Sequence, residues 1–271
     1  MIAILGAGRM GEALLSGLLR AGRPPAELAA VVRRPARADE LRAAYGVPVL
    51  SVVEAVKQAD TLVLAVKPQD MGRMLDEIAD LVTSTQLVIS IAAGITTSFI
   101  EQRFPVQAPV PLEVPVVRVM TNTPALVDEA MSVISAGSFA GEEHLRHAEE
   151  LLGTVGKVLR IPEYQQDAAT ALAGSGPAYL FYLVEAMVDA GLLLGMPRRT
   201  ALEMVTQTVY GAATMLRDSG EHPVILRDAV TSPAGTTIAA VRELEKHGVR
   251  AAFLAAIEAA RDRARELGEP A

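Results

Sequence analysis

The chain has 271 residues, of which 51% are hydrophobic and 21% are charged, and its formal net charge is -7. A chain of this composition is globular and long enough for two modest domains. The negative charge and the absence of Trp argue against nucleic-acid binding, so we expect small molecules or further copies of the chain as partners. Because the sequence has no Cys, disulfides, thiolate nucleophiles and sulfur-ligated metals are excluded as well.

The sequence does not suggest targeting to a membrane. Residues 1–5 lack a basic region, and their apolar run meets Gly6 at once. No apolar stretch of about 20 residues is free of charge, as a membrane-spanning helix requires. We therefore expect a cytoplasmic protein without a membrane span. No metal site is expected either, because His144 and His147 lie among glutamates on a charged helix.

The N-terminus carries a glycine motif that is typical of dinucleotide-binding folds. The apolar run 2–5 predicts a strand, and the helical spacing of apolar residues from Ala13 onward predicts a helix. The glycines between them suit a tight turn, a close approach to a pyrophosphate, and close packing of the helix on the strand. The residues expected to bind the cofactor here are Gly6, Gly8, Arg9, Met10 and Gly11.

The strand predicted over 28–32 is followed by Arg33 and Arg34, where the adenosine ribose of a bound dinucleotide should lie. A site for NAD usually places Asp or Glu here, to accept a hydrogen bond from the 2′-hydroxyl. Two guanidinium groups suit a 2′-phosphate instead, so NADPH is the expected cofactor, with NADH as the second choice. The alternative is a solvated basic loop before a helix at 36–45.

Strands and helices alternate as far as residue 104, which predicts a mostly parallel sheet. Further strands are expected at 60–66, 87–91, 116–120, 131–136 and 155–161, with a Pro-rich surface loop at 105–115. In such folds ligands bind beyond the carboxyl ends of the strands. The cofactor residues expected at these ends are Ala65, Val66, Lys67, Pro68, Ala92, Ala93, Gly94, Asn122 and Thr123.

From residue 162 onward the pattern is helical only. The expected fold is therefore an α/β Rossmann-like dinucleotide-binding domain over 1–161 and an all-α domain over 162–271. A helix at 177–194 is apolar on nearly every side, apart from Glu185 and Asp189. A small helical domain cannot enclose such a helix alone, so two subunits should interleave their helices in an obligate dimer.

A small-residue turn from Ser232 to Gly235 precedes a helix whose first turn carries the hydroxyls of Thr236 and Thr237. The first N–H groups of a helix are unpaired and lie at the positive end of its dipole, so this start suits a small carboxylate. The alternative is an ordinary capped helix start without a ligand.

Taken together, these segments resemble the pyrroline-5-carboxylate reductase family nearly from end to end. The most specific likeness runs from Leu226 to Thr237, and the other similar segments are 6–11, 65–69, 90–95, 122–127 and 174–179. The resemblance implies hydride transfer from NADPH or NADH to the C=N carbon of 1-pyrroline-5-carboxylate, which gives L-proline. It also implies a dimer formed through the helical domain, which in the family often assembles further into rings of five dimers.

The resemblance also assigns roles in the late turn. The residues that it places around the substrate carboxylate are Ser232, Ala234, Gly235, Thr236 and Thr237. Thr237 is the implied catalytic residue, as a hydrogen-bond donor near the ring nitrogen.

Three residues depart from the family pattern, namely Val52, Thr121 and Ala234. If Ala234 requires a positive φ, an alanine there is strained by about 1 kcal/mol. Two alternatives to the leading hypothesis therefore stay open. One is a reductase of a related cyclic imine or of a hydroxy acid on the same fold, and the other is a cofactor-binding homologue with weakened catalysis.

Overall fold

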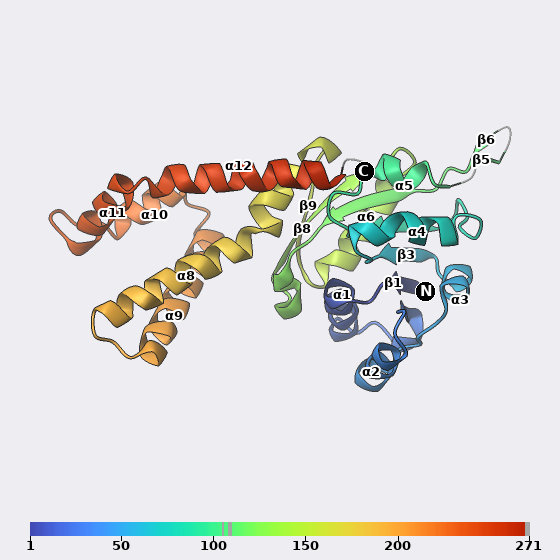
Figure 1. Cartoon of the computed structure of the whole chain (residues 1–271), viewed down its shortest axis with the longest axis horizontal. Coiled ribbons are helices and arrows are strands. Elements are labelled where there is room, and N and C mark those ends of the chain that lie inside the picture. The colour runs from blue at the N-terminus through green and yellow to red at the C-terminus, as the bar shows by residue number, and fades with distance from the viewer. Residues whose placement is uncertain (105, 108–109, 269–271) are drawn as a thin grey trace. The chain divides into compact units, whose positions relative to one another are not determined.

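The computed structural model describes residues 1–104, 106–107 and 110–268, and its elements are labelled in Figure 1. The chain divides into two compact units, one of Met1–Ser175 with Ala260–Ala271 and the other of Gly176–Ala259. The expected division of the domains after residue 161 stays a prediction, since these units are defined by their internal contacts alone.

The first unit contains all the strands described. They are β1 (Ile2–Leu5), β2 (Leu28–Val31), β3 (Thr61–Leu64), β4 (Leu87–Ser90), β5 (Val106–Gln107), β6 (Val110–Pro111), β7 (Val116–Met120), β8 (Ala130–Ala136) and β9 (Gly156–Arg160). Its helices are α1 (Arg9–Arg20), α2 (Pro35–Tyr45), α3 (Val52–Gln58), α4 (Pro68–Ile78), α5 (Thr97–Glu101), α6 (Glu142–Gly153) and α7 (Gln166–Ala169). Short helical turns are η1 (Pro25–Glu27), η2 (Thr123–Val127), η3 (Glu163–Gln165) and η4 (Thr170–Gly174).

Seven of these strands form one sheet in the order β2-β1-β3-β4-β7-β8-β9. Every neighbouring pair is parallel except β7 and β8, so the predicted mostly parallel sheet is confirmed. The stretch 105–115, expected to be an extended loop, also contains the short antiparallel pair β5–β6. Residues 105, 108 and 109 of that stretch lie outside the described residues.

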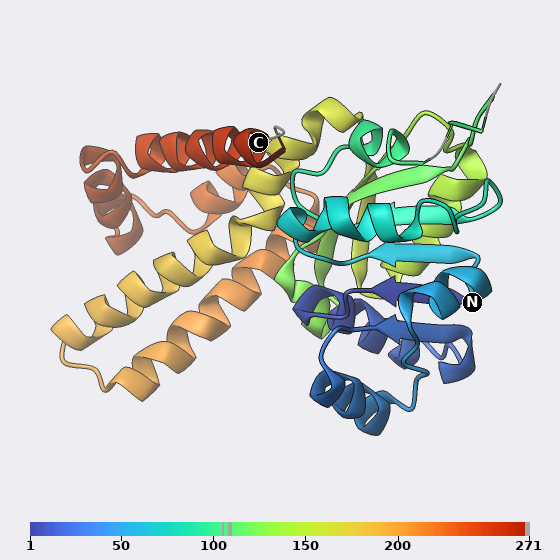
Figure 2. The same ribbon diagram turned by 45° about the vertical axis from the view of Figure 1, so that its right-hand side comes forward.

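The central strands β1, β3, β4 and β7 are buried at every position, because they are mainly apolar and helices cover both faces of the sheet. Alternate side chains of β1 enter two different apolar clusters. Ile4 packs in one cluster with Leu15 of α1 and Leu151 of α6, whereas Leu5 packs in the other with Leu75 of α4. Figure 2 shows the helices on the two sides of the sheet. The carboxyl ends of the parallel strands are thereby held in place at one edge.

The second unit consists of helices. They are α8 (Gly176–Leu193), α9 (Arg198–Ser219), α10 (Pro223–Ala229), α11 (Thr236–Lys246) and the beginning of α12 (Val249–Gly268), whose last residues belong to the first unit. Helices α8 and α9 lie side by side in Figures 1 and 2, and a Cβ atom at Gly191 would lie only 2.8 Å from the Cβ of Ala201. Small residues therefore allow these two helices to approach closely.

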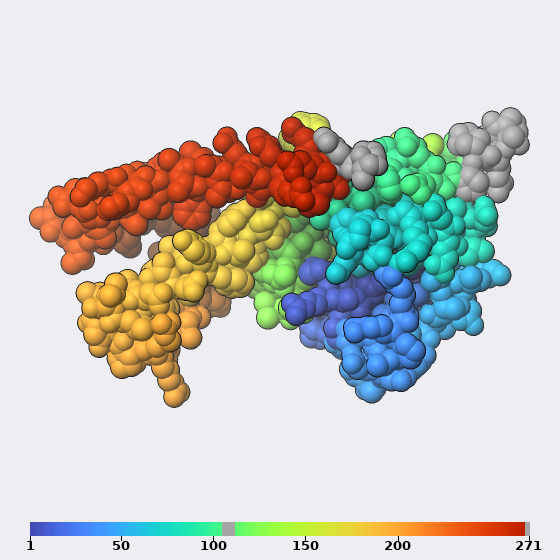
Figure 3. Space-filling view, viewed as in Figure 1, coloured from blue at the N-terminus to red at the C-terminus, as the bar shows by residue number. Residues whose placement is uncertain are grey.

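Few side chains of the second unit are buried. Among its described residues only Val188 and Ala201 are buried. In the space-filling view of Figure 3 the helices of this unit are coloured from yellow to red. The segment Glu163–Leu193 is long and apolar enough to cross a membrane by length and composition, and only 11% of its most apolar window is buried. A second copy of the chain could cover the same apolar surface.

Candidate functional site

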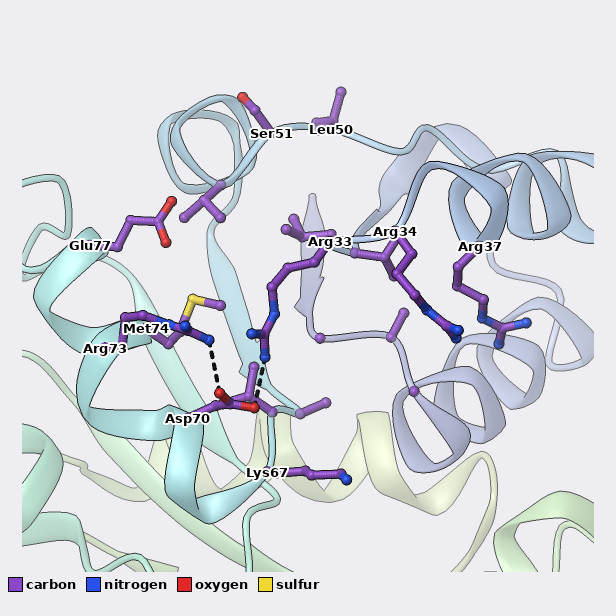
Figure 4. Close-up of a pocket in the computed structure, with 18 of the residues that line it drawn as sticks. Arg33, Arg34, Arg37, Leu50, Ser51, Lys67, Asp70, Arg73, Met74 and Glu77 are labelled. Atoms are coloured by element: carbon purple, nitrogen blue, oxygen red, sulfur yellow. Dashed lines mark hydrogen bonds and ion pairs between the residues drawn. The ribbon is translucent and has the colours of Figure 1, made fainter.

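A cavity of about 740 Å³ lies at the carboxyl ends of β1, β2 and β3. We call it the first cavity, and Figure 4 shows most of its lining. The residues that line it are Gly6, Ala7, Gly8, Val31, Val32, Arg33, Arg34, Arg37, Leu50, Ser51, Val52, Ala65, Val66, Lys67, Gln69, Asp70, Arg73, Met74 and Glu77. Arg9, Met10, Gly11 and Pro68 were also predicted as cofactor residues and are not among them.

The glycine turn between β1 and α1 requires its glycines for steric reasons. Gly6 has a φ of +92°, and a Cβ atom there would lie 2.6 Å from Cγ1 of Val66. A Cβ atom on Gly11 would lie 3.0 Å from Cγ2 of Ile4, so this glycine lets α1 pack closely on β1. At Gly8, by contrast, a Cβ atom would have only open space and the Gly6 carbonyl at 3.9 Å.

Helix α1 therefore begins beside the open side of Gly8. Gly8 is its N-cap residue, and no side chain caps the amides of the first turn. Unpaired amides at the positive end of a helix dipole bind anions. Arg9 and Met10 supply these first amides. They could therefore bind an anion through their backbone N–H groups, although they are not among the residues that line the cavity.

Most arginines in the first cavity are paired with carboxylates. Arg33 and Arg73 both donate to Asp70, at 2.7 Å and 2.8 Å. Arg37 is paired with Glu40 at 2.9 Å and with Glu12. The hydrogen bond to Glu40 raises the pKa of Arg37, the bond to Glu12 adds to this effect, and partial burial opposes it.

Two cations of the first cavity are unpaired. Within the described part of the chain, Arg34 and Lys67 make no ion pair, and no interaction is drawn to them in Figure 4. Arg34 is the N-cap residue of α2, and Lys67 is the N-cap residue of α4. Both charges thus lie beside a helix N-terminus, which favours an anionic ligand.

A smaller cavity of about 250 Å³, the second cavity, lies at the carboxyl ends of β4 and β7. The residues that line it are Ile91, Ala92, Ala93, Gly94, Arg118, Val119, Met120, Thr121, Gln166, Thr170, Gly174 and Ser175. Three of the predicted cofactor residues, Ala92, Ala93 and Gly94, are in this lining, whereas Asn122 and Thr123 are not. Both cavities therefore lie along the same edge of the sheet.

The side chain of Asn122 is used inside the protein. Its Nδ2 donates to the carbonyl of Ala173 at 2.9 Å, and its Oδ1 accepts from the amide of Met131 at 3.0 Å. These bonds join the turn after β7 to β8 and to η4. A direct contact between Asn122 and a cofactor stays a prediction, and the observed bonds give this residue a role in positioning the wall of the second cavity.

Two polar residues of the second cavity were missed by the sequence analysis. Arg118, with 6% of its side chain exposed, pairs with Glu163 at 3.3 Å and with Asp167 at 3.1 Å. Gln166 is fully buried, and its Oε1 is the one buried side-chain nitrogen or oxygen without a partner in the part of the chain described. Arg118 was detectable, because a charged residue inside an otherwise apolar strand is unusual; Gln166 carried no such signal.

The turn before α11 lies in the second unit and is strained. Ala234 has a φ of +57°, so the condition for strain at this residue is met. Gly235 donates its amide to the carbonyl of Ser232 at 3.1 Å and is the N-cap residue of α11, without a side-chain cap. In the described structure the hydroxyls of Thr236 and Thr237 have no hydrogen-bond partner. The amides and hydroxyls of this helix start are therefore free to bind a ligand.

The predicted substrate residues and the two cavities belong to different units, because residues of the first unit line both cavities. The roles of Ser232, Ala234, Gly235, Thr236 and Thr237 thus stay predictions, as do those of the cofactor residues. Within the described residues, no group of His, Asp and Glu is arranged to hold a metal ion.

Two family models match separate parts of the chain. Residues 163–267 match pyrroline-5-carboxylate reductase dimerisation, and residues 1–94 match NADP oxidoreductase, coenzyme F420-dependent. The first of these supports the formation of homodimers, and the second supports a nicotinamide cofactor.

Relatives of known name match over the whole length. The pyrroline-5-carboxylate reductase of Corynebacterium melassecola is 43% identical over 272 residues, which cover 99% of this chain and 98% of that protein. The structure of a pyrroline-5-carboxylate reductase from Coxiella burnetii has a TM-score of 0.91 at 34% identity, covering 99% and 98% of the two chains. The Plasmodium falciparum pyrroline carboxylate reductase, solved with NADP bound, has a TM-score of 0.86 at 28% identity and the same coverage. The Rossmann-like sheet and the helical C-terminal part agree with these structures, and the chain belongs to the pyrroline-5-carboxylate reductase family.

Proposed function

We propose that this protein reduces 1-pyrroline-5-carboxylate to L-proline, the last step of proline biosynthesis, with a hydride taken from NADPH. The observation that carries this proposal is the 43% identity to a named reductase over 99% of the chain. A reductase of another cyclic imine, or a homologue with weakened catalysis, would share the fold but has weaker support.

The first cavity suits the adenosine half of the dinucleotide. The open space at Gly8 accommodates a pyrophosphate, which the amides of Arg9 and Met10 would hold at the start of α1. Gly11 would contribute by letting α1 pack closely on β1. Beyond β3, Ala65, Val66, Lys67 and Pro68 would flank the cofactor. No acidic residue follows β2, where Arg33 and Arg34 stand instead, so NADPH is the proposed cofactor and NADH the weaker one.

The second cavity suits the nicotinamide half, because it lies along the same sheet edge at the ends of β4 and β7. Ala92, Ala93 and Gly94 would face the ring, and Asn122 and Thr123 would support this wall from the adjoining turn. When bound, the cofactor supplies the hydride. The protein holds the two reactants in register and keeps water away from them.

The start of α11 would hold the substrate. Its unpaired amides and the hydroxyl of Thr236 suit the carboxylate, and the turn of Ser232, Ala234 and Gly235 presents them. Thr237 would donate a hydrogen bond to the ring nitrogen. The substrate reacts as the iminium ion, whose nitrogen already carries the proton that the product needs, and a lone pair develops on that nitrogen as the hydride reaches the neighbouring carbon. The bond from Thr237 strengthens as this lone pair develops, so it favours the transition state over the ground state.

The proposed working form is a cytoplasmic homodimer joined through the helical unit, with a ring of five dimers as a further assembly. The dimerisation match begins at residue 163 and includes the apolar segment Glu163–Leu193. A second copy of the chain is therefore the proposed cover of that segment, in place of a membrane.

One assay tests the function directly. The absorbance of NADPH is followed after 1-pyrroline-5-carboxylate is added. Three parallel reactions replace NADPH by NADH, replace the substrate by a six-membered cyclic imine, or combine a hydroxy acid with the oxidised cofactor. We expect the fastest turnover with pyrroline-5-carboxylate and NADPH. Intact nucleotide binding without turnover would reject the reductase proposal and favour the homologue with weakened catalysis.

A further inference from the structure

Asp70 holds two arginines of the first cavity at once. Its Oδ2 accepts from Nη2 of Arg33 at 2.7 Å, and its Oδ1 accepts from Nη2 of Arg73 at 2.8 Å. The Asp70 side chain is 25% exposed, whereas those of Arg33 and Arg73 are 64% and 65% exposed. Asp70 is therefore the most buried member of this trio, and it holds Arg33 against α4.

Arg34 points in a different direction. Figure 4 shows Arg33 extending toward Asp70, whereas Arg34 extends toward Arg37. Arg37 is itself paired with Glu12 and Glu40. Of the four arginines that line the cavity, Arg34 is the one without a carboxylate partner in the described structure. Its full charge is available to an anion.

The surroundings of Arg34 add to this availability. It is the N-cap residue of α2, an 11-residue helix whose first amides have no side-chain cap. Ser51 is the one residue of the lining with a hydroxyl group, and that hydroxyl is used elsewhere, since it donates to Glu54 at 2.7 Å and accepts from the Glu54 amide at 3.3 Å. An anion that reaches this end of the cavity therefore meets Arg34 and the start of α2.

We propose that Arg34 binds the 2′-phosphate of NADPH, and that Asp70, by holding Arg33 away, sets the margin by which the site prefers NADPH over NADH. For Arg33 to bind the phosphate, it must first give up a charge-assisted hydrogen bond to Asp70, which offsets much of the gain. The Asp70 carboxylate also repels the phosphate. This inference rests on the proposed function, because it requires NADP(H) in the first cavity.

The test compares two fragments of the cofactor. The affinities of the full-length protein for 2′,5′-ADP and for 5′-AMP are measured by titration calorimetry at one fixed ionic strength. Their ratio isolates the contribution of the 2′-phosphate and does not depend on catalysis. We expect the ratio to fall about 10- to 30-fold in Arg34→Gln and less than about 3-fold in Arg33→Gln.

Asp70→Asn is the variant that separates the roles. Asn has the size of Asp without its charge, so Arg33 is released and the ratio should rise about 3- to 10-fold. In the double variant Asp70→Asn with Arg33→Gln, most of this gain should vanish, because the gain depends on the released Arg33. The affinity for 5′-AMP and the unfolding temperature serve as controls of folding.

Three results would overturn the inference. The first is an equal fall of the affinity ratio in Arg33→Gln and Arg34→Gln. The second is a fall of the ratio in Asp70→Asn, and the third is a wild-type ratio close to one. A fall in Asp70→Asn would mean that Asp70 orients Arg33 onto the phosphate. The proposed function is tested separately, by turnover. If the wild-type protein does not reduce pyrroline-5-carboxylate but the affinity ratios follow the expected order, the proposed function is wrong and the inference about Arg34 and Asp70 stands.

Discussion

The two units of this protein differ in how they cover their apolar surface. In the first, the central strands of the sheet are buried by helices of the same chain, and Leu5 of β1 lies in one apolar cluster with Leu75 of α4. In the second, α8 is apolar along most of its length, yet Val188 is its only buried residue. One unit is complete in a single chain and the other is not. The first unit can thus fold within one subunit, while the second has apolar surface that a second copy of the chain would cover.

Polar contacts differ between the units in the same way. In the first, ion pairs join distant parts of the chain, as Arg20 and Asp128 do across 108 residues. The hydrogen bond from Arg20 lowers the pKa of Asp128. In the second, ion pairs such as Arg250 with Glu245 join residues that are close in sequence. Long-range pairs specify a tertiary structure, whereas local pairs stabilise individual helices by only a few tenths of a kcal/mol each.

The largest expected effect comes from a charge on the uncovered helix. Leu180→Glu places a carboxylate on α8, at a leucine that is 52% exposed in the single chain. A buried, unpaired charge in a dimer interface costs several kcal/mol, so we expect dimers to be lost and reductase activity to fall below about 1%. Leu159→Glu, at a leucine of β9 that is 57% exposed, is the matched control and should leave assembly and activity unchanged. A dimeric, active Leu180→Glu protein would contradict the contrast between the units.

The next effect separates catalysis from cofactor binding. Thr237→Val keeps the shape of the side chain and removes the hydroxyl that we place at the ring nitrogen. We expect kcat to fall about 30- to 100-fold with nucleotide affinity unchanged, because the lost bond is strongest in the transition state. Thr208→Val, which makes the same change in α9 where the hydroxyl donates to Met204, should affect neither quantity. Parallel losses of turnover and affinity would argue against this role for Thr237.

A smaller effect tests how tightly the turn between β1 and α1 packs in the first unit. Gly6 and Gly22 have nearly the same φ, +92° and +91°, but a Cβ atom on Gly22 would have nothing within 4 Å. Both alanine variants should lose about 1–2 kcal/mol of stability through backbone strain. Only Gly6→Ala also displaces Val66, so only this variant should weaken binding of 2′,5′-ADP, by about 10-fold. Equal affinities in the two variants would contradict a tightly packed cofactor turn.

The smallest effect concerns the strained turn of the second unit. Ala234→Gly relieves the positive φ and should raise the free energy of unfolding by about 0.5–1 kcal/mol, or the unfolding temperature by about 2–4 °C. Ala239→Gly, inside α11, should lower stability by about 1 kcal/mol, because there glycine only adds freedom to the unfolded chain. If both variants lose stability alike, Ala234 is not strained.

Much of the first unit was predictable from local patterns. The apolar run at Ile2 and the glycines from Gly6 to Gly11 indicated strand, turn and helix, and the structure has them as β1 and α1. The structure also has the predicted strands as β2, β3, β4, β7, β8 and β9. The ion pairs of Arg33 with Asp70 and of Arg37 with Glu12 were not predictable, since these partners lie far apart in sequence and only the fold brings them together.

The sequence by itself determined the periodicity of each element, the turn at Gly6 and the presence of an apolar helix too exposed for one chain, because these depend on residues close together along the backbone. Only the tertiary structure decided which charges are free. Among the described residues it leaves Arg34 without an ion pair while Asp70 accepts from Arg33, and it uses the side-chain amide of Asn122 in hydrogen bonds within the protein. The physical reason is that an ion pair or a buried hydrogen bond requires two groups within about 3 Å, and strand order rather than sequence spacing sets that distance.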